Sequence, residues 1–475
     1  VEINPAFINL LLHEPEFTNF VGLNKLDGVN LVVDEARSWF ARSEDKFDII
    51  QMSLIDTWAA TGAGAFTLSE NGLYTVEAWQ IFMDRLSENG VFTVSRWYSP
   101  KDTAETGRLV SLAVGALLEK GIKAPKDHIF LSAGSNIASL IVSPTGFTPQ
   151  ELQSLTEASD RLRFARLIAP GEPIKSETLK SIVSVADQAE LKRLAGGFRL
   201  DISAPTDDRP FFFNQLPLWD AMSVMLFGFE KMPAGVAYGN MQATATLVTL
   251  FIIALVLVIV AIVLPLRHAL ADVGGRLATA GSAYFILIGA GFMLIEIAFL
   301  QRFSVFLGHP IYSLSIVLFS LILSTGIGSL VSDRYSLASR GRFLVWSLLT
   351  FGYIILQVTF VPPLLLGLDS SSLVLRGLIV IAVILPAGLL MGFAFPTGMQ
   401  FISAIDDRPT PWFWGINGAS GVLASALAVG CSISYGISVT LTLGAICYLL
   451  LVPAAFMIGF PDAAKLGKTG AGSPN

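Results

Sequence analysis

The sequence predicts an α/β domain followed by an all-α transmembrane bundle of about seven helices. Seven long apolar stretches fill the second half of the chain, from Thr244 to Phe460, and almost no charge lies inside them. The first, Thr244 to Pro265, has no charged residue over a length that can cross a bilayer. Before residue 240, short apolar runs alternate with amphipathic stretches, which is typical of a parallel α/β sheet.

The charge of the chain divides at the same place. Of its 31 Lys/Arg and 37 Asp/Glu, 21 and 30 fall in residues 1–240, a net charge of −9, and the remainder has a net charge of +3. An acidic soluble half excludes nucleic acid as its expected partner, since phosphate binding needs a basic surface. The two cysteines, Cys431 and Cys447, lie in apolar segments and are expected to be packing residues. No zinc-type cluster is found, so no metal is expected.

The α/β pattern fills residues 1–205. Pro5 opens a short helix at its first turn, and Asn89-Gly90 is expected to close the longer helix at 73–86. The predicted strands are 1–4, 29–34, 47–55, 91–97, 127–132 and 137–142. The predicted helices are 5–12, 35–42, 73–86, 104–120, 148–166 and 176–195.

Residue 1 is Val, and the residues after it read as the end of a strand and not as a signal peptide. We expect the natural chain to begin further upstream. A nucleotide-binding fold needs a Gly-rich turn after its first strand, where backbone can approach a ligand closely. The Gly62-Ala63-Gly64 stretch follows a later strand and is a weak substitute, more typical of a loop over the site or a turn.

Acids follow the predicted strands at the edge where ligands bind in such sheets. Glu2 is placed to accept hydrogen bonds from ribose hydroxyls, and Asp34, one strand further on, to accept from an adenine amino group. With the neighbouring Glu35 they form the candidate cofactor-binding set. The alternative is that acids at strand ends simply cap the following helices.

Several runs in the first hundred residues resemble the spermidine synthase (aminopropyltransferase) family, which has a methyltransferase-type fold. They are VEINP, DEARSWF, FDIIQMSLIDTW and LYTVEAWQIFMDRLSENGVFTV, in this order. The later TDDRPFFF and FMLIEIAFLQRF resemble the membrane-fused branch of that family. The resemblance implies a Rossmann-like domain, incomplete at its N-terminus. It also implies that this domain uses decarboxylated S-adenosylmethionine, or S-adenosylmethionine, and a polyamine-like amine.

The family carries a D-x-x-D pair after its fourth strand, and the matching positions here are Ser53 and Asp56. The first acid, the family's general base, is therefore replaced by Ser53, whose hydroxyl is no base near neutral pH without help. Asp56 taking over as base, a substrate other than a diamine, and a domain that binds a nucleoside without turnover all stay open. Trp58, Thr61 and Tyr74 lie where the family closes its substrate loop, or they are ordinary packing residues.

The predicted spans are 244–265, 281–303, 311–331, 343–366, 374–400, 414–434 and 438–459. Glycines at 326, 328, 388 and 392 are expected to give small faces for close helix packing. Pro386 and Pro396 should kink the fifth span. Glu296, near the middle of its span, is the clearest intramembrane candidate. It would bind a cation such as a polyamine or relay a proton, or it is a protonated carboxyl bonded to a neighbouring helix.

Residues 206–240 are predicted to be an aromatic interfacial connector, and 461–475 a flexible tail. Within the connector, Asp207, Asp208 and Arg209 are expected either to tie the α/β domain to the bundle by an ion pair or to form an exposed turn. The expected partner of the bundle, 241–460, is the lipid bilayer.

The charges in the loops conflict with the expected orientation. Adenosyl cofactors are cytosolic, so we expect an integral protein of a bacterial inner membrane whose α/β domain faces the cytoplasm. With seven spans, the positive-inside rule favours the reverse. The loops opposite the domain hold Arg267, Arg276, Arg334, Arg340, Arg342, Arg408, Lys465 and Lys468, against Lys231, Arg302 and Arg376 on its own side.

Three functions fit the sequence. The first is a membrane-anchored aminopropyltransferase-like enzyme that acts on a small-molecule amine. The second is a transporter or channel whose synthase-like domain senses a nucleoside or polyamine. The third is a structural subunit of a larger membrane assembly, bound to other membrane subunits, in which the domain is degenerate.

Overall fold

The computed structural model describes residues 1–54, 67–100, 104–227, 236–270 and 273–460 of the 475-residue chain. The chain forms two compact units. The first comprises residues 1–244 together with the short segment 368–372, and the second comprises 245–367 and 373–475. Asp56, Trp58 and Thr61 lie outside the described residues.

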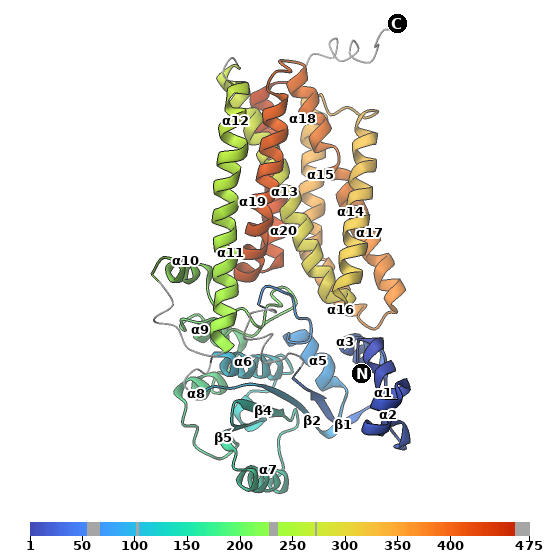
Figure 1. Ribbon diagram of the computed structural model, residues 1–475, viewed down its shortest axis with the longest axis vertical. Coiled ribbons are helices and arrows are strands. Elements are labelled where there is room, and N and C mark those ends of the chain that lie inside the picture. The colour runs from blue at the N-terminus through green and yellow to red at the C-terminus, as the bar shows by residue number, and fades with distance from the viewer. Residues whose placement is uncertain (55–66, 101–103, 228–235, 271–272, 461–475) are drawn as a thin grey trace. The chain divides into compact units, whose positions relative to one another are not determined.

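The first unit holds a mixed five-stranded sheet with the strand order β1-β2-β4-β3-β5 (Figure 1). Its strands are β1 (Phe47–Met52), β2 (Leu86–Trp97), β3 (Ile129–Gly134), β4 (Ile137–Val142) and β5 (Ala165–Ile168). Strands β1 and β2 run parallel, whereas β2–β4, β3–β4 and β3–β5 are antiparallel. The predicted parallel sheet is thus only partly correct. Ser135 and Asn136 alone join β3 to β4, which allows a hairpin but no parallel crossover.

The helices of the first unit mostly match the predicted ranges. They are α1 (Pro5–His13), α2 (Pro15–Val21), α3 (Ala36–Arg42), α5 (Val76–Asp84), α6 (Ala104–Glu119), α7 (Pro149–Leu162), α8 (Glu177–Val183), α9 (Gln188–Ala195) and α10 (Leu218–Phe227). The single helix predicted over 176–195 is two helices. Asp187 begins the second of them, because its side chain accepts a hydrogen bond from the Glu190 backbone N–H at 2.7 Å.

Two predictions about the first unit were wrong: the helix end at Asn89-Gly90, and the strands at 1–4 and 29–34. Asn89-Gly90 do not end a helix, since α5 stops at Asp84 and both residues lie within β2. A Cβ on Gly90 would lie 2.7 Å from the Phe47 carbonyl oxygen, so glycine permits the close approach of β1 where the register shifts. The segments 1–4 and 29–34, predicted as strands, meet only in one parallel bridge between Glu2 and Val33.

The core of the first unit lies between the sheet and the helices α5 and α6, and α7 lies on the opposite side of the sheet (Figure 1). Phe211, Phe212 and Phe213 are buried, and the last two belong to this core. These rings stand at the start of the segment predicted to be an interfacial connector. Burial in a protein core and contact with a membrane surface both favour aromatic side chains, so an aromatic run does not by itself distinguish the two. For the rest of 206–240 the interfacial connector stays a prediction.

Within its described ranges the chain has seven helices long and apolar enough to cross a membrane, as predicted, and they make up the second unit. The spans are Met241–Leu270, Gly275–Leu307, Ile311–Ser332, Arg340–Thr359, Leu373–Ser403, Thr410–Tyr435 and Ile437–Ile458. Their elements are α11 (Val236–Val258), a π-helical turn (Ile259–Val263), α12 (Leu264–Leu266), α13 (Gly275–Leu307), α14 (Pro310–Ser332), α15 (Arg340–Thr359), α16 (Val361–Gly367), α17 (Leu373–Met391), α18 (Ala394–Ser403), α19 (Thr410–Tyr435) and α20 (Ile437–Ile458). The chain is therefore an integral membrane protein.

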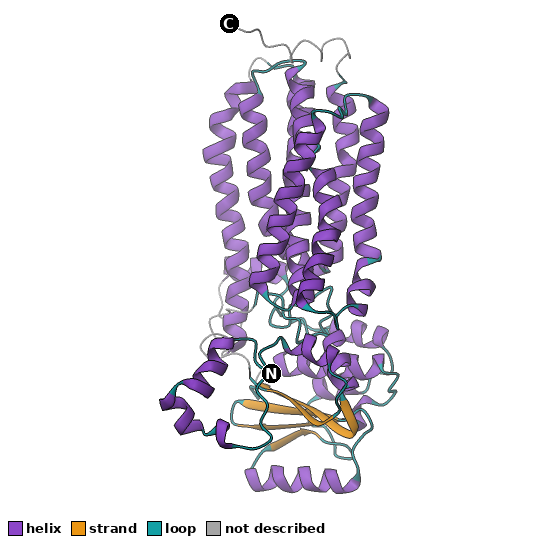
Figure 2. Ribbon diagram, turned by 90° about the vertical axis from the view of Figure 1, so that its right-hand side faces the viewer, coloured by secondary structure: helices purple, strands orange, loops and turns teal. Residues whose placement is uncertain are grey.

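Helix α13 packs against α14, α19 and α20. Figure 2 shows the long helices of this unit lying alongside one another. The fifth span is interrupted at Gly392-Phe393, between α17 and α18, while Pro386 stays inside α17. Gly388 and Gly392 face α14 so closely that an added Cβ would lie 1.9 and 2.3 Å from its atoms. These glycines therefore give the small packing faces that the sequence predicted.

Candidate functional site

The structure brings the two predicted nucleoside-binding acids together. The backbone N–H of Glu2 donates to the Val32 carbonyl at 2.9 Å, and the Asp34 N–H donates to the Glu2 carbonyl at 3.1 Å. Both residues therefore end neighbouring parallel segments, as the sequence predicted for a pair that contacts one ligand. Ribose and adenine recognition by these acids stays a prediction.

The side chains of these acids also show the capping alternative. One oxygen of Glu2 accepts from the Asn4 N–H at 2.8 Å, and one oxygen of Asp34 accepts from the Glu35 N–H at 2.8 Å. The other oxygen of Asp34 pairs with Arg42. Oε2 of Glu2 has no hydrogen-bond partner among the described residues, so it is the carboxylate oxygen most open to a ligand.

Glu35 has a structural role. Its carboxylate accepts from the backbone N–H groups of Arg37 at 2.9 Å and Ser38 at 2.8 Å, and from the Ser38 hydroxyl at 2.6 Å. It is the N-cap of α3. Because both of its oxygens are used in this way, Glu35 is better explained by helix capping than by cofactor binding.

Of the predicted catalytic and substrate-binding residues, Ser53 is exposed and Tyr74 is buried. Ser53 comes directly after β1, the edge strand that pairs in parallel with β2. Tyr74 is fully buried, and its ring stacks on Phe212 at 4.5 Å between centroids. The Arg96 guanidinium lies 5.6 Å from the Tyr74 ring centroid. For Tyr74 the structure therefore favours the packing alternative over a substrate-binding loop.

A buried ion cluster around Arg37 was not predicted. The Arg37 side chain is 4% exposed, and its two terminal nitrogens bind the two oxygens of Asp207 at 2.7 and 2.6 Å. The same guanidinium donates to one oxygen of Asp369 at 3.2 and 2.9 Å. Thr75 donates to Asp207 at 2.8 Å, and Glu77 accepts from the Asp207 backbone N–H at 3.0 Å.

The polar residues of the predicted connector thus form ion pairs inside the first unit. Asp207 pairs with Arg37, and Arg209 pairs with Asp201. Burial opposes the charge of Arg37, but its two carboxylate partners outweigh burial and raise its pKa. Burial, and then the negative charge of Asp207, raise the pKa of Glu77 to about 7.

We expect the first unit to become less stable as pH rises, because the folded chain holds the proton of Glu77 more tightly than the unfolded chain does. The unfolded chain loses this proton near pH 4.5, whereas the folded chain keeps it up to about pH 7. The stabilisation is therefore complete below pH 4.5 and lost between pH 4.5 and 7. In Glu77→Gln, which stays neutral and keeps an acceptor for the Asp207 N–H, this loss should disappear.

The measurement is urea unfolding of wild type and Glu77→Gln at pH 4.5, 6, 7 and 8. The unfolding free energy of the variant relative to wild type should rise by on the order of 2 kcal/mol across the window and then stay level. Other carboxylates titrate equally in both proteins and cancel in the difference. Parallel pH profiles would contradict this prediction, because they would show that the pKa of Glu77 is the same in the folded and the unfolded chain.

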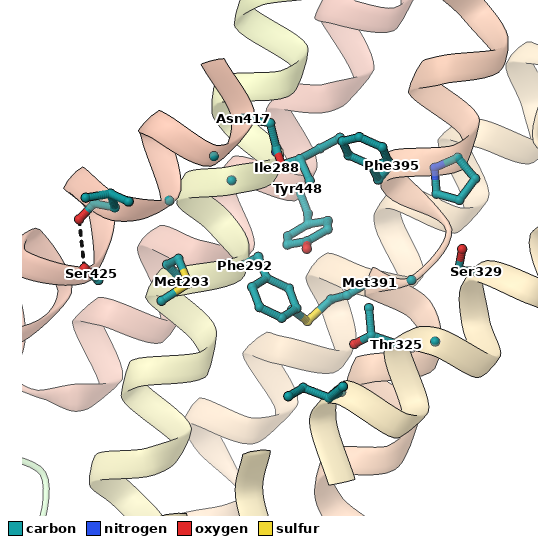
Figure 3. A pocket seen from close by; sticks show the side chains of 18 residues that line it. Ile288, Phe292, Met293, Thr325, Ser329, Met391, Phe395, Asn417, Ser425 and Tyr448 are labelled. Atoms are coloured by element: carbon teal, nitrogen blue, oxygen red, sulfur yellow. Dashed lines mark hydrogen bonds between the residues drawn. The ribbon is translucent and has the colours of Figure 1, made fainter. Parts of the chain in front are cut away.

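In the second unit, Glu296 is half-buried on α13. It has no hydrogen-bond or ion-pair partner within the described ranges, so bonding to a neighbouring helix does not explain it. A cavity lies one helical turn away along α13, at Phe292, but Glu296 is not part of its lining (Figure 3). No group of three His, Cys, Asp or Glu that could hold a metal occurs in the described part of the chain.

Comparison with known proteins does not assign this chain to a family. No protein-family model, no curated protein and no solved structure matches this chain. Function is therefore inferred from the residues themselves.

Proposed function

We propose that the protein is a membrane-bound aminopropyltransferase-like enzyme. Its first unit would bind decarboxylated S-adenosylmethionine, or a related adenosyl sulfonium, and a polyamine-like amine. The observation that supports this most directly is the parallel pairing that sets Glu2 and Asp34 at adjacent segment ends, with one oxygen of Glu2 available. The exposed position of Ser53 after β1 agrees with it.

In the proposed reaction, the lone pair of a neutral amine attacks the propyl carbon next to the sulfonium. The new C–N bond forms as the C–S bond breaks, and the sulfur leaves with the bonding electrons as neutral methylthioadenosine. The amine then carries one proton too many, and a carboxylate must accept it. Asp56 is the candidate base, since Ser53 stands where the family has its acid.

The proposed activity implies an orientation of the chain in the membrane. A domain that uses adenosyl sulfonium substrates would face the cytoplasm, and the chain would lie in a bacterial inner membrane. The loop charges favour the opposite orientation, so protease protection of the first unit in sealed inside-out vesicles is a necessary check. Protection there would contradict the cytoplasmic assignment.

Binding is tested by calorimetry on the full chain in detergent with S-adenosylmethionine, its decarboxylated form and methylthioadenosine. We expect at least one to bind and Glu2→Gln to weaken it about tenfold, because a hydrogen bond to a charged acceptor is lost. The matched control is Glu44→Gln, an exposed carboxylate outside the site. The absence of heat with all three nucleosides would overturn the proposal.

Turnover is tested separately with decarboxylated S-adenosylmethionine, putrescine or spermidine, and detection of methylthioadenosine. Amine-dependent release that is lost in Asp56→Asn would support transfer with Asp56 as the base. Nucleoside binding without release would overturn the transferase assignment and favour a domain that binds without turnover.

A further inference from the structure

The second unit contains a cavity of about 660 Å³ between its helices (Figure 3). Eighteen residues line it, from α13, α14, α17, α18, α19 and α20 and from the break between α17 and α18. Its volume falls within the range of about 300–1,000 Å³ that small-molecule sites occupy. The cavity lies wholly among membrane-spanning helices, so its occupant must be compatible with hydrocarbon.

The lining excludes a charged ligand. None of the eighteen residues is Asp, Glu, Lys, Arg or His, and most are apolar or glycine. An ion here would lose its water without gaining a countercharge, which costs far more than a neutral polar group does. A polyamine is therefore a poor fit, although the polyamine-binding candidate Glu296 lies only one helical turn beyond Phe292.

The hydroxyl of Tyr448, a buried residue, points into this cavity (Figure 3). Tyr448 is 1% exposed, and its hydroxyl has no hydrogen-bond partner among the residues that the structure describes. Figure 3 shows the hydroxyl directed into the middle of the cavity. Asn417, Thr325 and Ser425 already donate to backbone carbonyls of Phe285, Leu321 and Val422, at 3.0, 2.6 and 2.8 Å. A buried donor left unpaired is unfavourable, so an acceptor on a ligand would complete it.

The cavity has an opening on the outside of the bundle. Two of its lining residues are strongly exposed, Ile322 on α14 at 62% and Val422 on α19 at 56%. In an embedded bundle, exposed apolar side chains of this kind face the lipid chains. A ligand can therefore enter sideways, between α14 and α19, from the hydrocarbon region.

We propose that this cavity binds a neutral, lipid-soluble molecule whose carbonyl oxygen accepts a hydrogen bond from Tyr448. The apolar walls take up the body of the molecule, and the hydroxyl fixes its orientation. Prenyl quinones and acyl esters share this chemistry. The site is independent of the nucleoside site proposed in the first unit.

The test measures equilibrium binding to the full chain in nanodiscs of saturated phosphatidylcholine. The probes are a short-chain prenyl quinone, a monoacylglycerol, and a prenyl hydrocarbon of equal length without a carbonyl. We expect one carbonyl probe to bind at least tenfold more tightly than the hydrocarbon, and the tighter of the two assigns the source. Equal binding of the hydrocarbon, or no binding of either carbonyl probe, would overturn the proposal.

Three variants locate the site. Tyr448→Phe removes only the hydroxyl and should weaken the carbonyl probe about tenfold. Gly326→Leu should abolish binding, because Gly326 lines the cavity and an added Cβ meets nothing within 4 Å. Gly352→Leu, on α15 and equally uncrowded but outside the lining, should bind as wild type does.

Two results would contradict the assignment even if a probe binds. One is unchanged affinity in both Tyr448→Phe and Gly326→Leu, which would place the probe elsewhere. The other is displacement of the probe by spermidine, which would show that the site accepts a cation.

Discussion

Arg37→Met is expected to destabilise the first unit by about 3–5 kcal/mol, the cost of removing one partner from a buried ion pair. Arg37 is 4% exposed and donates hydrogen bonds to two carboxylates. Its two terminal nitrogens bind the two oxygens of Asp207, and its Nε and one terminal nitrogen bind a single oxygen of Asp369. Methionine fills a similar volume but supplies no charge. Two neighbouring acids would then be left without their shared cation, and Glu77 adds a third acid beside Asp207.

The measurement is pulse proteolysis in urea, which reports unfolding of the first unit without requiring the membrane bundle to unfold. The matched control is Arg42→Met. Arg42 also pairs with one acid, Asp34, but their side chains are 31% and 28% exposed, so its loss should cost about 0–1 kcal/mol. Equal effects of the two substitutions would contradict a stabilising cluster.

A second variant distinguishes the cost of leaving the acids without a cation from the cost of losing the packing of the Arg37 side chain. If the penalty in Arg37→Met comes from uncompensated acids, Asp207→Asn in the same chain should recover part of it, because one of those acids is now neutral. A double variant as unstable as the sum of its parts would instead point to lost packing around the arginine stem.

The membrane half could be predicted closely because lipid leaves a chain few options. A run such as Thr244–Pro265 must form a helix when no water can satisfy its backbone, and the structure has a span over Met241–Leu270. The same argument predicted the other six spans. Small shifts at their ends, such as the start at Gly275 instead of residue 281, reflect polar turns that extend the helices beyond the apolar core.

The first unit was harder because its pattern depends on connections. The segments at 129–134 and 137–142 read correctly as strands, but the two-residue link of Ser135 and Asn136 was a sign of a hairpin and so of an antiparallel pair. A two-residue link between these strands therefore predicts a mixed sheet and not a parallel one.

The Arg37 cluster could not be predicted from local pattern. Its acids lie 170 and 332 residues away along the chain, and only the fold brings them together. The pair of Glu2 and Asp34 could be predicted, because acids at the ends of parallel segments are neighbours whenever those segments pair. Sequence therefore located the two acids at the ends of paired segments. It missed the ion cluster, in which Arg37 on α3 meets acids from distant parts of the chain.

Gly328→Ala is expected to destabilise the membrane bundle by about 1–3 kcal/mol, because the substitution overpacks a close helix contact. A Cβ at this position of α14 would lie 2.2 Å from the Leu389 carbonyl oxygen and 3.0 Å from its carbon, both on α17. These atoms are backbone, so no flexible side chain can move aside. The helices must separate, and the neighbouring contact of Gly392 with Thr325 would loosen as well.

Gly326→Ala provides the matched control on the same helix. Only two residues away, it points to a different side, and an added Cβ meets nothing within 4 Å. Alanine there should be neutral or slightly stabilising, since glycine is the poorer helix former by up to about 1 kcal/mol. The fraction of protein left monomeric after heating in mild detergent should therefore fall at lower temperature for Gly328→Ala alone. Equal unfolding temperatures for the two variants would contradict the prediction, because they would show that the close approach of α14 and α17 at Gly328 does not limit the stability of the bundle.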